Sequence, residues 1–153
     1  MVSENNDILD IKKILKILPH RYPLLLIDRI LDFKIFDYLK ALKNCTINEP
    51  FFQGHFLHEP IFPGILLIEA MTQAAAVLMY KSENVLSINK LYYFVGIEQA
   101  RFKKNIIPGD QIFIEVLYLK KKRNLIKFKV IAIVENLKIC HATILFYKKV
   151  NIK

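Results

Sequence analysis

The stretch IFPGILLIEAMTQAAAVLMY, residues 61–80, decides the fold of this protein. From Ile65 to about Tyr80 it predicts a helix that is apolar around its whole circumference. Such a helix has to be buried on every side, because it has no polar face to present to water. A proline, a glycine and a glutamate interrupt the stretch, so its clean apolar part is too short to cross a bilayer. The pattern therefore predicts a core helix.

Most of the remaining chain shows patterns typical of β-strands. Strands are expected over 24–33 and around 38–47 before the core helix, and near 91–102, 110–120, 124–135 and 138–149 after it. In 124–135 large apolar residues alternate with lysines, which is the period of a strand with one buried face. A short helix over 7–18 precedes the strands, with Asp7 as its N-cap and Pro19 after its end.

These elements predict an α+β fold. One buried helix and five or six antiparallel strands with short turns are most simply combined as one curved sheet wrapped around the helix. A sheet covers only one side of a helix, so the uncovered flank is expected to meet a second copy of the chain. The 153 residues match the size of one domain, and we expect a single domain over residues 1–153.

The composition is that of a globular protein, with 54% hydrophobic residues and a net charge of +9. The positive charge comes from 19 Lys and only 4 Arg. Because nucleic-acid recognition relies on the planar fork of Arg, this composition does not favour a nucleic-acid partner. Cys45 and Cys140 are too far apart in the chain to form a Cys-x-x-Cys motif, and the N-terminus does not have the pattern of a signal peptide. We expect a cytoplasmic protein with no membrane partner.

Two titratable residues near the start of the core helix are candidates for catalysis. Glu69 is the only charged residue of that helix, and burial should raise the pKa of its carboxyl. Gln73 lies one turn further on and could hold this carboxyl. His55 precedes a bend that contains two prolines and is a candidate base. The alternatives are an exposed or lysine-paired Glu69, and a metal site at His55 and His58, for which no third ligand follows at the usual spacing.

Gly64 adds a third group, because it lies at the start of the core helix. The first amides of a helix have no partner within it, so they can polarise a carbonyl group. Glu69 follows ~7.5 Å further along the helix axis at ~1.5 Å per residue. A histidine base, a carboxylic acid and a carbonyl-polarising amide are the groups needed for reversible β-elimination of water. The alternative is that Pro63-Gly64 only begins the helix and allows close packing.

Four segments together resemble one family. GHFLHEPIFPGILLIEAMTQ (54–73) resembles the signature of the hot-dog-fold (3R)-hydroxyacyl-acyl-carrier-protein dehydratases of the FabZ type. LPHRYPLLLIDRI (18–30), INEPFFQGHF (47–56) and VGIEQARFKKNIIPGDQI (95–112) resemble further family segments in the same order. The resemblance covers roughly residues 8–148. One departure is Leu57, where the family commonly has proline.

The resemblance implies a hot-dog fold and a dehydratase of fatty acid biosynthesis that forms the trans-2-enoyl thioester. It implies His55 as the base, Glu69 as the acid, and Gly64 and Ile65 as substrate-binding positions, with neither a cofactor nor a metal. In the family, the catalytic pair meets across a dimer interface and the dimers form hexamers, as trimers of dimers. Glu rather than Asp at position 69 favours dehydration without isomerisation.

Two alternatives to a dehydratase stay open from the sequence. One is another hot-dog enzyme, either a thioesterase or a CoA-linked hydratase, and the other is a non-catalytic acyl-thioester-binding protein. The family substrate is carried by an acidic acyl carrier protein, which the basic segment 101–104 could attract. Its neighbour, 105–110, is apolar enough to form the mouth of an acyl tunnel. These lysines could also belong to the general lysine excess of the chain.

Overall fold

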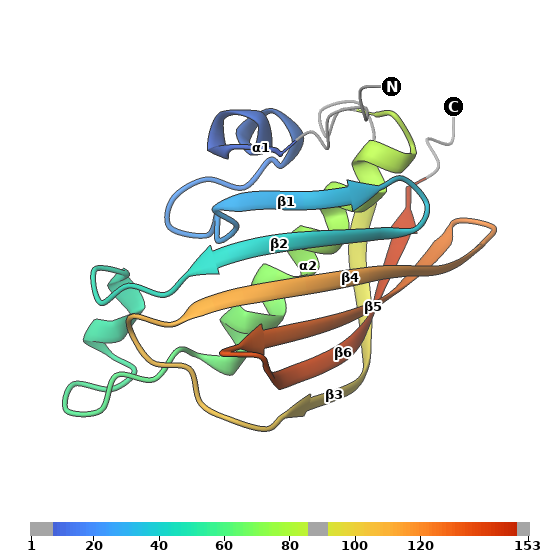
Figure 1. Ribbon diagram of the computed structural model, residues 1–153. Helices are drawn as coiled ribbons and strands as arrows, with labels where there is room; N and C mark the ends of the chain where they lie inside the picture. The colour runs from blue at the N-terminus through green and yellow to red at the C-terminus, as the bar shows by residue number, and fades with distance from the viewer. Residues whose placement is uncertain (1–7, 86–91, 150–153) are drawn as a thin grey trace.

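A six-stranded antiparallel sheet curves around one long helix in the computed structural model, which describes residues 8–85 and 92–149 (Figure 1). The elements in chain order are α1 (Ile11–Ile17), β1 (Arg29–Lys34), β2 (Tyr38–Asn44), the 3-10 helix η1 (Pro50–Gln53), α2 (Gly64–Ser82), β3 (Tyr92–Phe102), β4 (Gln111–Lys122), β5 (Leu125–Val134) and β6 (Leu137–Lys148). The strand order in the sheet is β1-β2-β4-β5-β6-β3. The predicted α+β architecture is confirmed.

Helix α2 is the predicted core helix, extended by two residues at its C-terminal end. From Leu67 to Tyr80 every residue except Glu69 is buried. The helix is long and apolar enough to cross a membrane, but 72% of its apolar window is buried inside the protein, as in a core helix. The first turn differs from the prediction, because Ile65 is 75% exposed. The sheet therefore covers most of α2 but leaves its N-terminal end open.

The last three strands form two hairpins that follow the predicted alternation. Along β5, the side chains of Ile126, Phe128 and Val130 are fully buried. The turn between β5 and β6 consists of Glu135 and Asn136, both with positive φ angles (50° and 63°). A two-residue turn with this backbone matches the natural twist of the strands that it joins.

The N-terminal third departs most from the sequence prediction. Helix α1 begins at Ile11, and Asp10 caps it by accepting a hydrogen bond of 2.9 Å from the Lys13 amide. The predicted cap, Asp7, lies outside the described residues. The predicted strand over 24–33 begins only at Arg29.

The segment before β1 follows an irregular path because its backbone is bonded elsewhere. The amides of Leu24 and Leu25 both donate to the carbonyl oxygen of Arg21, and the Leu26 amide donates to the Gln73 side chain on α2. A short apolar run is compatible with a strand or with a packed loop. In this segment, the hydrogen bond from Leu26 to α2 favours the packed loop over the strand.

We expect the burial of Phe128 in the core to contribute strongly to the stability of the fold. Its ring makes edge-on contacts with Tyr118 and Phe146, at centroid distances of 5.4 and 6.0 Å. Phe128→Ala should lower the free energy of unfolding by about 3–5 kcal/mol, because it leaves a cavity in the core. Urea denaturation measures this change. The exposed neighbour Lys129 is the control, and Lys129→Ala should change stability by less than about 0.5 kcal/mol. Equal effects of the two substitutions would contradict this account of the core.

Candidate active site

The two proposed catalytic residues line different cavities of the chain. The His55 cavity, of about 270 Å³, is lined by His55, Phe56, Ile61, Phe62, Gly64, Leu67, Phe102, Lys104, Asn105 and Ile106. The Glu69 cavity, of about 200 Å³, is lined by Pro19, His20, Glu69, Thr72, Gln73, Ala76, Tyr80, Tyr92, Phe94 and Phe146. Helix α2 contributes to both cavities, with its first residue at one and Glu69 at the other. A single chain therefore places the two candidate residues at separate cavities, each a candidate half-site.

His55 is held in the loop between η1 and α2 with one ring nitrogen already bonded. Its Nδ1 lies 2.7 Å from the carbonyl oxygen of Ile61, and the Ile61 amide donates to the His55 carbonyl at 3.0 Å. Because a carbonyl oxygen only accepts, Nδ1 must carry the proton. In the neutral ring Nε2 then has a free lone pair. This tautomer makes His55 suitable as a base.

An aromatic cluster anchors this loop to the sheet. Phe51, Phe52 and Phe62 pack against one another, with centroid distances between 4.8 and 6.4 Å. Lys43 on β2 is only 4% exposed, forms an ion pair with Glu49, and has its ammonium 5.6 Å from the centre of the Phe62 ring. A buried ion pair needs such additional partners to offset its desolvation. The loop that carries His55 is therefore fixed at both of its ends.

Glu69 is half-buried, and its carboxyl contacts two donors. His20 Nε2 lies 3.2 Å from Oε1, and Gln73 Nε2 donates to the same oxygen at 2.9 Å. The pKa of Glu69 is lowered, chiefly by hydrogen bonding with His20, with burial acting in the opposite direction. The predicted rise in its pKa is therefore wrong. The reason is that the hydrogen bonds to the carboxylate outweigh a desolvation that is incomplete, since the side chain is 35% exposed.

Gln73 holds the Glu69 carboxyl as predicted and also joins α2 to the N-terminal segment. Its Nε2 donates to the Leu24 carbonyl at 2.6 Å, and its Oε1 accepts from the Leu26 amide at 2.9 Å. The side chain is only 1% exposed, and both of its polar atoms form hydrogen bonds within the protein. This side chain therefore sets the position of the carboxyl relative to residues 24–26.

The first turn of α2 carries the two predicted substrate-binding positions. Gly64 is the first helical residue, and the amides of Leu66 and Leu67 bond to the Pro63 carbonyl. A Cβ atom at Gly64 would come within 3.0 Å of the Phe102 ring. This supports the alternative that Gly64 allows close packing at the start of the helix. Close packing does not conflict with an amide that polarises a carbonyl group. Ile65 points away from the core and is exposed.

The basic segment and the apolar loop after it lie beside the His55 cavity. Lys103 and Lys104 are exposed, and Lys104 is one of the residues that line the cavity. Ile107 is exposed, as expected at a tunnel mouth. Ile106 is buried instead, and its carbonyl accepts a hydrogen bond of 2.8 Å from the Phe62 amide. Ile106 thus holds the loop in place from inside.

Sequence reasoning missed His20. It lies in segment 18–30, which carries part of the family resemblance. This resemblance was the only feature of the sequence that could have indicated a role for His20. Its separation from Glu69 in the chain hid the contact between the two. The aromatic wall of the Glu69 cavity, formed by Tyr80, Tyr92, Phe94 and Phe146, was missed for the same reason.

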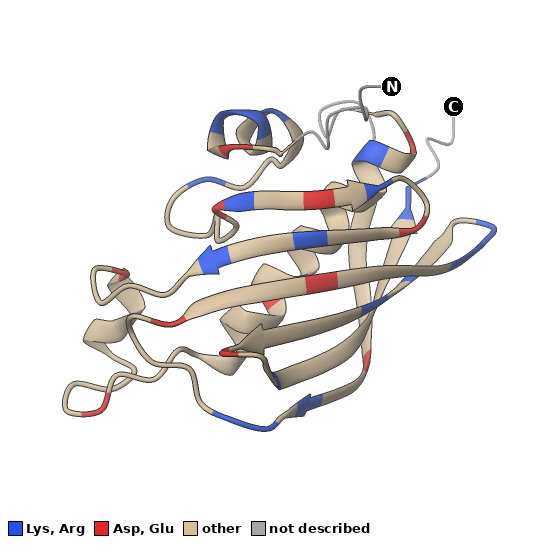
Figure 2. Ribbon diagram, viewed as in Figure 1, with Lys and Arg blue, Asp and Glu red and all other residues tan. Residues whose placement is uncertain are grey.

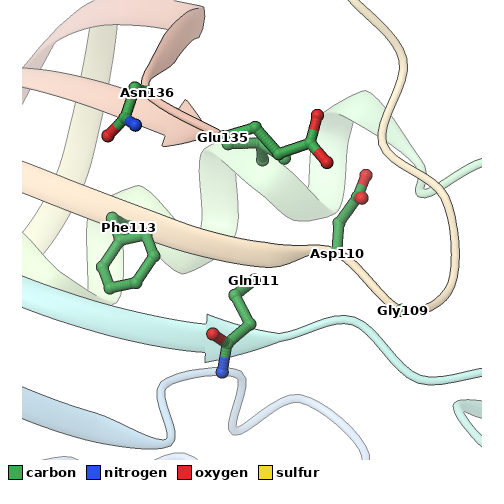
Figure 3. A pocket seen from close by; sticks show the side chains of 7 residues that line it. Gly109, Asp110, Gln111, Phe113, Glu135 and Asn136 are labelled. Carbon is green, nitrogen blue, oxygen red and sulfur yellow. The ribbon is translucent and has the colours of Figure 1, made fainter.

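A larger cavity, of about 380 Å³, lies elsewhere on the sheet and contains neither candidate residue (Figure 3). Gly109, Asp110, Gln111, Phe113, Val134, Glu135 and Asn136 line it. Asp110 is engaged in its own loop, because Oδ2 accepts a hydrogen bond from the Ile107 amide at 3.0 Å. This cavity has carboxylates but no histidine base, so it does not provide the groups for elimination. Within residues 8–85 and 92–149, no three His, Cys, Asp or Glu side chains are grouped to hold a metal ion.

Comparisons with known proteins agree with this geometry. Residues 18–143 match the family model of the FabA-like domain. The chain is 72% identical over 148 residues to the 3-hydroxyacyl-[acyl-carrier-protein] dehydratase FabZ of Buchnera aphidicola subsp. Schizaphis graminum, which covers 97% of both chains. It is 49% identical to the protein of the same name from Escherichia coli strain K12, over 94% of this chain and 95% of that one.

Solved structures show the fold independently of sequence. The dehydratase heterocomplex ApeI:P from Xenorhabdus doucetiae contains a chain that matches with a TM-score of 0.75 at 16% identity, over 90% of this chain and 91% of that one. A hypothetical thioesterase protein from Streptococcus pneumoniae, solved with coenzyme A, matches with a TM-score of 0.62 at 10% identity, over 78% and 84% of the two chains. At these identities the likeness concerns the fold alone, and it confirms the expected hot-dog architecture.

Proposed function

Because this chain belongs to the FabZ-type 3-hydroxyacyl-acyl-carrier-protein dehydratases, we propose that His55 and Glu69 are the residues that remove water from its substrate. The enzyme is a hydro-lyase, and its reaction is the dehydration of a 3-hydroxyacyl group on acyl carrier protein in fatty acid biosynthesis. The observation that carries the assignment of His55 is the contact between its Nδ1 and the Ile61 carbonyl, which leaves Nε2 free to accept a proton.

Three groups take part in the elimination: the first amides of α2, His55 and Glu69. The amides of Gly64 and Ile65, which have no partner within α2, polarise the thioester carbonyl and make the α-proton more acidic. His55 Nε2 takes this proton, and the electron pair of the C–H bond forms the new double bond. The C–O bond at carbon 3 breaks, and the hydroxyl leaves as water with a proton from Glu69. The products are the trans-2-enoyl thioester and water.

The lowered pKa of Glu69 sets a condition on this mechanism. In the free chain the carboxyl is ionised at neutral pH, because its donors stabilise the carboxylate. An acyl chain in the Glu69 cavity and a second protomer over it would remove water from the carboxyl. Such desolvation acts to raise the pKa and so to supply the protonated acid.

The active site requires two copies of the chain. His55 and Glu69 line separate cavities within one chain. Strand β3 is an edge strand of the sheet and exposes the large side chains of Tyr93, Phe94 and Val95. A long exposed apolar edge is a template for pairing with another strand. We therefore assign β3 to a dimer interface that brings His55 together with Glu69 of the partner subunit, with three dimers forming the complete particle.

The remaining assignments follow from the family and the composition. The whole chain, residues 1–153, forms one domain that acts in the cytoplasm without a cofactor. Its macromolecular partner is acyl carrier protein, and neither nucleic acid nor membrane is involved in its activity. Arg101 near the end of β3 and Lys103 and Lys104 in the loop after it provide the docking surface (Figure 2).

Substitution of the catalytic pair tests the mechanism directly. His55→Ala should lower dehydration of 3-hydroxyacyl-acyl-carrier-protein by on the order of 10²–10⁴-fold without unfolding the protein, because it removes the base. Glu69→Gln should lower kcat more than it raises KM, because the amide cannot donate the proton in the same way. The measurement follows enoyl absorbance, with circular dichroism as the check on folding.

The His141→Ala variant, on β6, is the matched control. An active His55→Ala variant would remove His55 from the mechanism, and thioester hydrolysis in place of dehydration would favour a thioesterase.

The docking surface is tested by reversing its charge. Lys103→Glu with Lys104→Glu should raise KM for the acyl-carrier-protein substrate several-fold, because the acidic carrier is no longer attracted. KM for a small N-acetylcysteamine thioester should stay unchanged. The effect should weaken with added salt, which shortens the Debye length to ~8 Å at physiological ionic strength. Lys120 and Lys122, at the far end of β4, provide the charge-matched control pair. Equal losses on both substrates would mean that the carrier docks elsewhere.

The dimer is tested by light scattering at micromolar concentration. We expect a dimer or a larger assembly, because a single chain leaves the apolar edge of β3 and the half-sites exposed. A folded, stable and active monomer would contradict both the interface and the shared active site.

A further inference from the structure

We propose that His20 is a positioning residue for Glu69, holding one carboxyl oxygen so that the other is directed to the substrate hydroxyl. This inference rests on the proposed role of Glu69 as the acid. It assigns a function to a side chain that touches neither the thioester nor the α-proton in the mechanism above.

The contacts of the carboxyl divide its two oxygens. His20 Nε2 and Gln73 Nε2 both approach Oε1, at 3.2 and 2.9 Å. Across the described ranges 8–85 and 92–149, no side chain or amide donates a hydrogen bond to Oε2. A carboxyl that is held through one oxygen has its second oxygen in a defined direction. Both donors line the same cavity as Glu69, so Oε2 is the oxygen available to a molecule in that cavity.

His20 is itself held by the end of α1. The neighbouring Arg21 guanidinium donates to the carbonyl oxygens of Leu15, Leu18 and His20, at 3.0, 2.8 and 2.6 Å. These hydrogen bonds fasten the backbone at His20 to the last turn of the helix. Gln73 binds the same N-terminal segment a few residues later, at Leu24 and Leu26. The two donors of Glu69 are thus parts of one connected support.

The hydrogen bonding of the His20 ring does not fit a purely structural role. Its Nδ1 is buried and has no hydrogen-bond partner within the part of the chain that the structure describes. A histidine that only fills space in a core usually has both of its nitrogens satisfied. Among residues 8–85 and 92–149, the polar contact of the ring is the one to Glu69. The ring is therefore oriented by the carboxyl that it supports.

The chemistry of the contact suits a group that repeatedly gains and loses a proton. A donor on Oε1 stabilises the carboxylate that forms when Glu69 gives its proton to the leaving hydroxyl. The lowered pKa of Glu69 agrees with this direction. The other titratable side chains of the cavity are Tyr80 and Tyr92, whose pKa values are raised by burial, for Tyr92 to about 12. Both stay neutral in the working range, so neither adds a charge beside Glu69.

Two substitutions at position 20 separate positioning from folding. His20→Leu removes the donor, whereas His20→Gln places an amide Nε2 that can donate as the imidazole Nε2 does. We expect His20→Leu to lower kcat by on the order of 10–100-fold with little change in KM, because misplacing a catalytic group acts on the transition state. His20→Gln should recover most of this loss. His141→Leu, which removes a histidine on β6, is the matched control.

The pH profile of kcat distinguishes the two roles, because a purely structural role of His20 would leave the profile unchanged. Removing the His20 donor removes the main cause of the lowered Glu69 pKa, so the limb of the profile that reports Glu69 should shift to higher pH in His20→Leu. An unshifted limb with wild-type kcat in His20→Leu would overturn the inference. So would equal losses in the Leu and Gln variants with a lowered Tm, since that result indicates a structural role. An inactive wild-type enzyme would instead refute the proposed function itself.

Discussion

The burial of α2 inside the curved sheet is the constraint on which the rest of the structure depends. From Leu67 to Tyr80 only Glu69 escapes full burial, so the helix cannot rotate or slide without exposing apolar side chains. This fixes the start of the helix at Gly64 against the Phe102 ring and directs Glu69 to the cavity beside His20. The packing that stabilises the fold thereby also fixes the positions of Gly64 and Glu69, each at its own cavity.

Polar side chains then connect this helix and the sheet to the irregular segments that carry His20 and His55. Gln73 bonds α2 to the segment before β1, and the Lys43–Glu49 pair with the aromatic cluster bonds the His55 loop to β2. Both connections are buried, where a polar group has to be satisfied to be tolerated. Two loops without regular structure are in this way held by specific contacts, as a catalytic geometry requires.

The division of the site between two cavities relates oligomerisation to activity. His55 and Glu69, the proposed base and acid, lie at different cavities, so they can act on the same substrate only if a second chain supplies one of them. The exposed edge of β3 and the exposed first turn of α2 are the surfaces that such a chain would cover. Covering them would also remove water from Glu69, so assembly would adjust the proton affinity of the acid. In the proposed mechanism, assembly and catalysis therefore depend on the same exposed apolar surface.

The sequence by itself determined the core helix, the six strands, the family, and His55, Glu69, Gly64 and Ile65 as candidates, because these follow from local periodicity and from compact motifs. Gln73 was also predictable, since it lies one helical turn from Glu69. Only the tertiary structure decided the irregular path before β1, the contact with His20, the direction of the Glu69 pKa shift and the separation of the two half-sites. Each of these depends on which distant segments meet and on how much water remains between them, and no local pattern of residues contains that information.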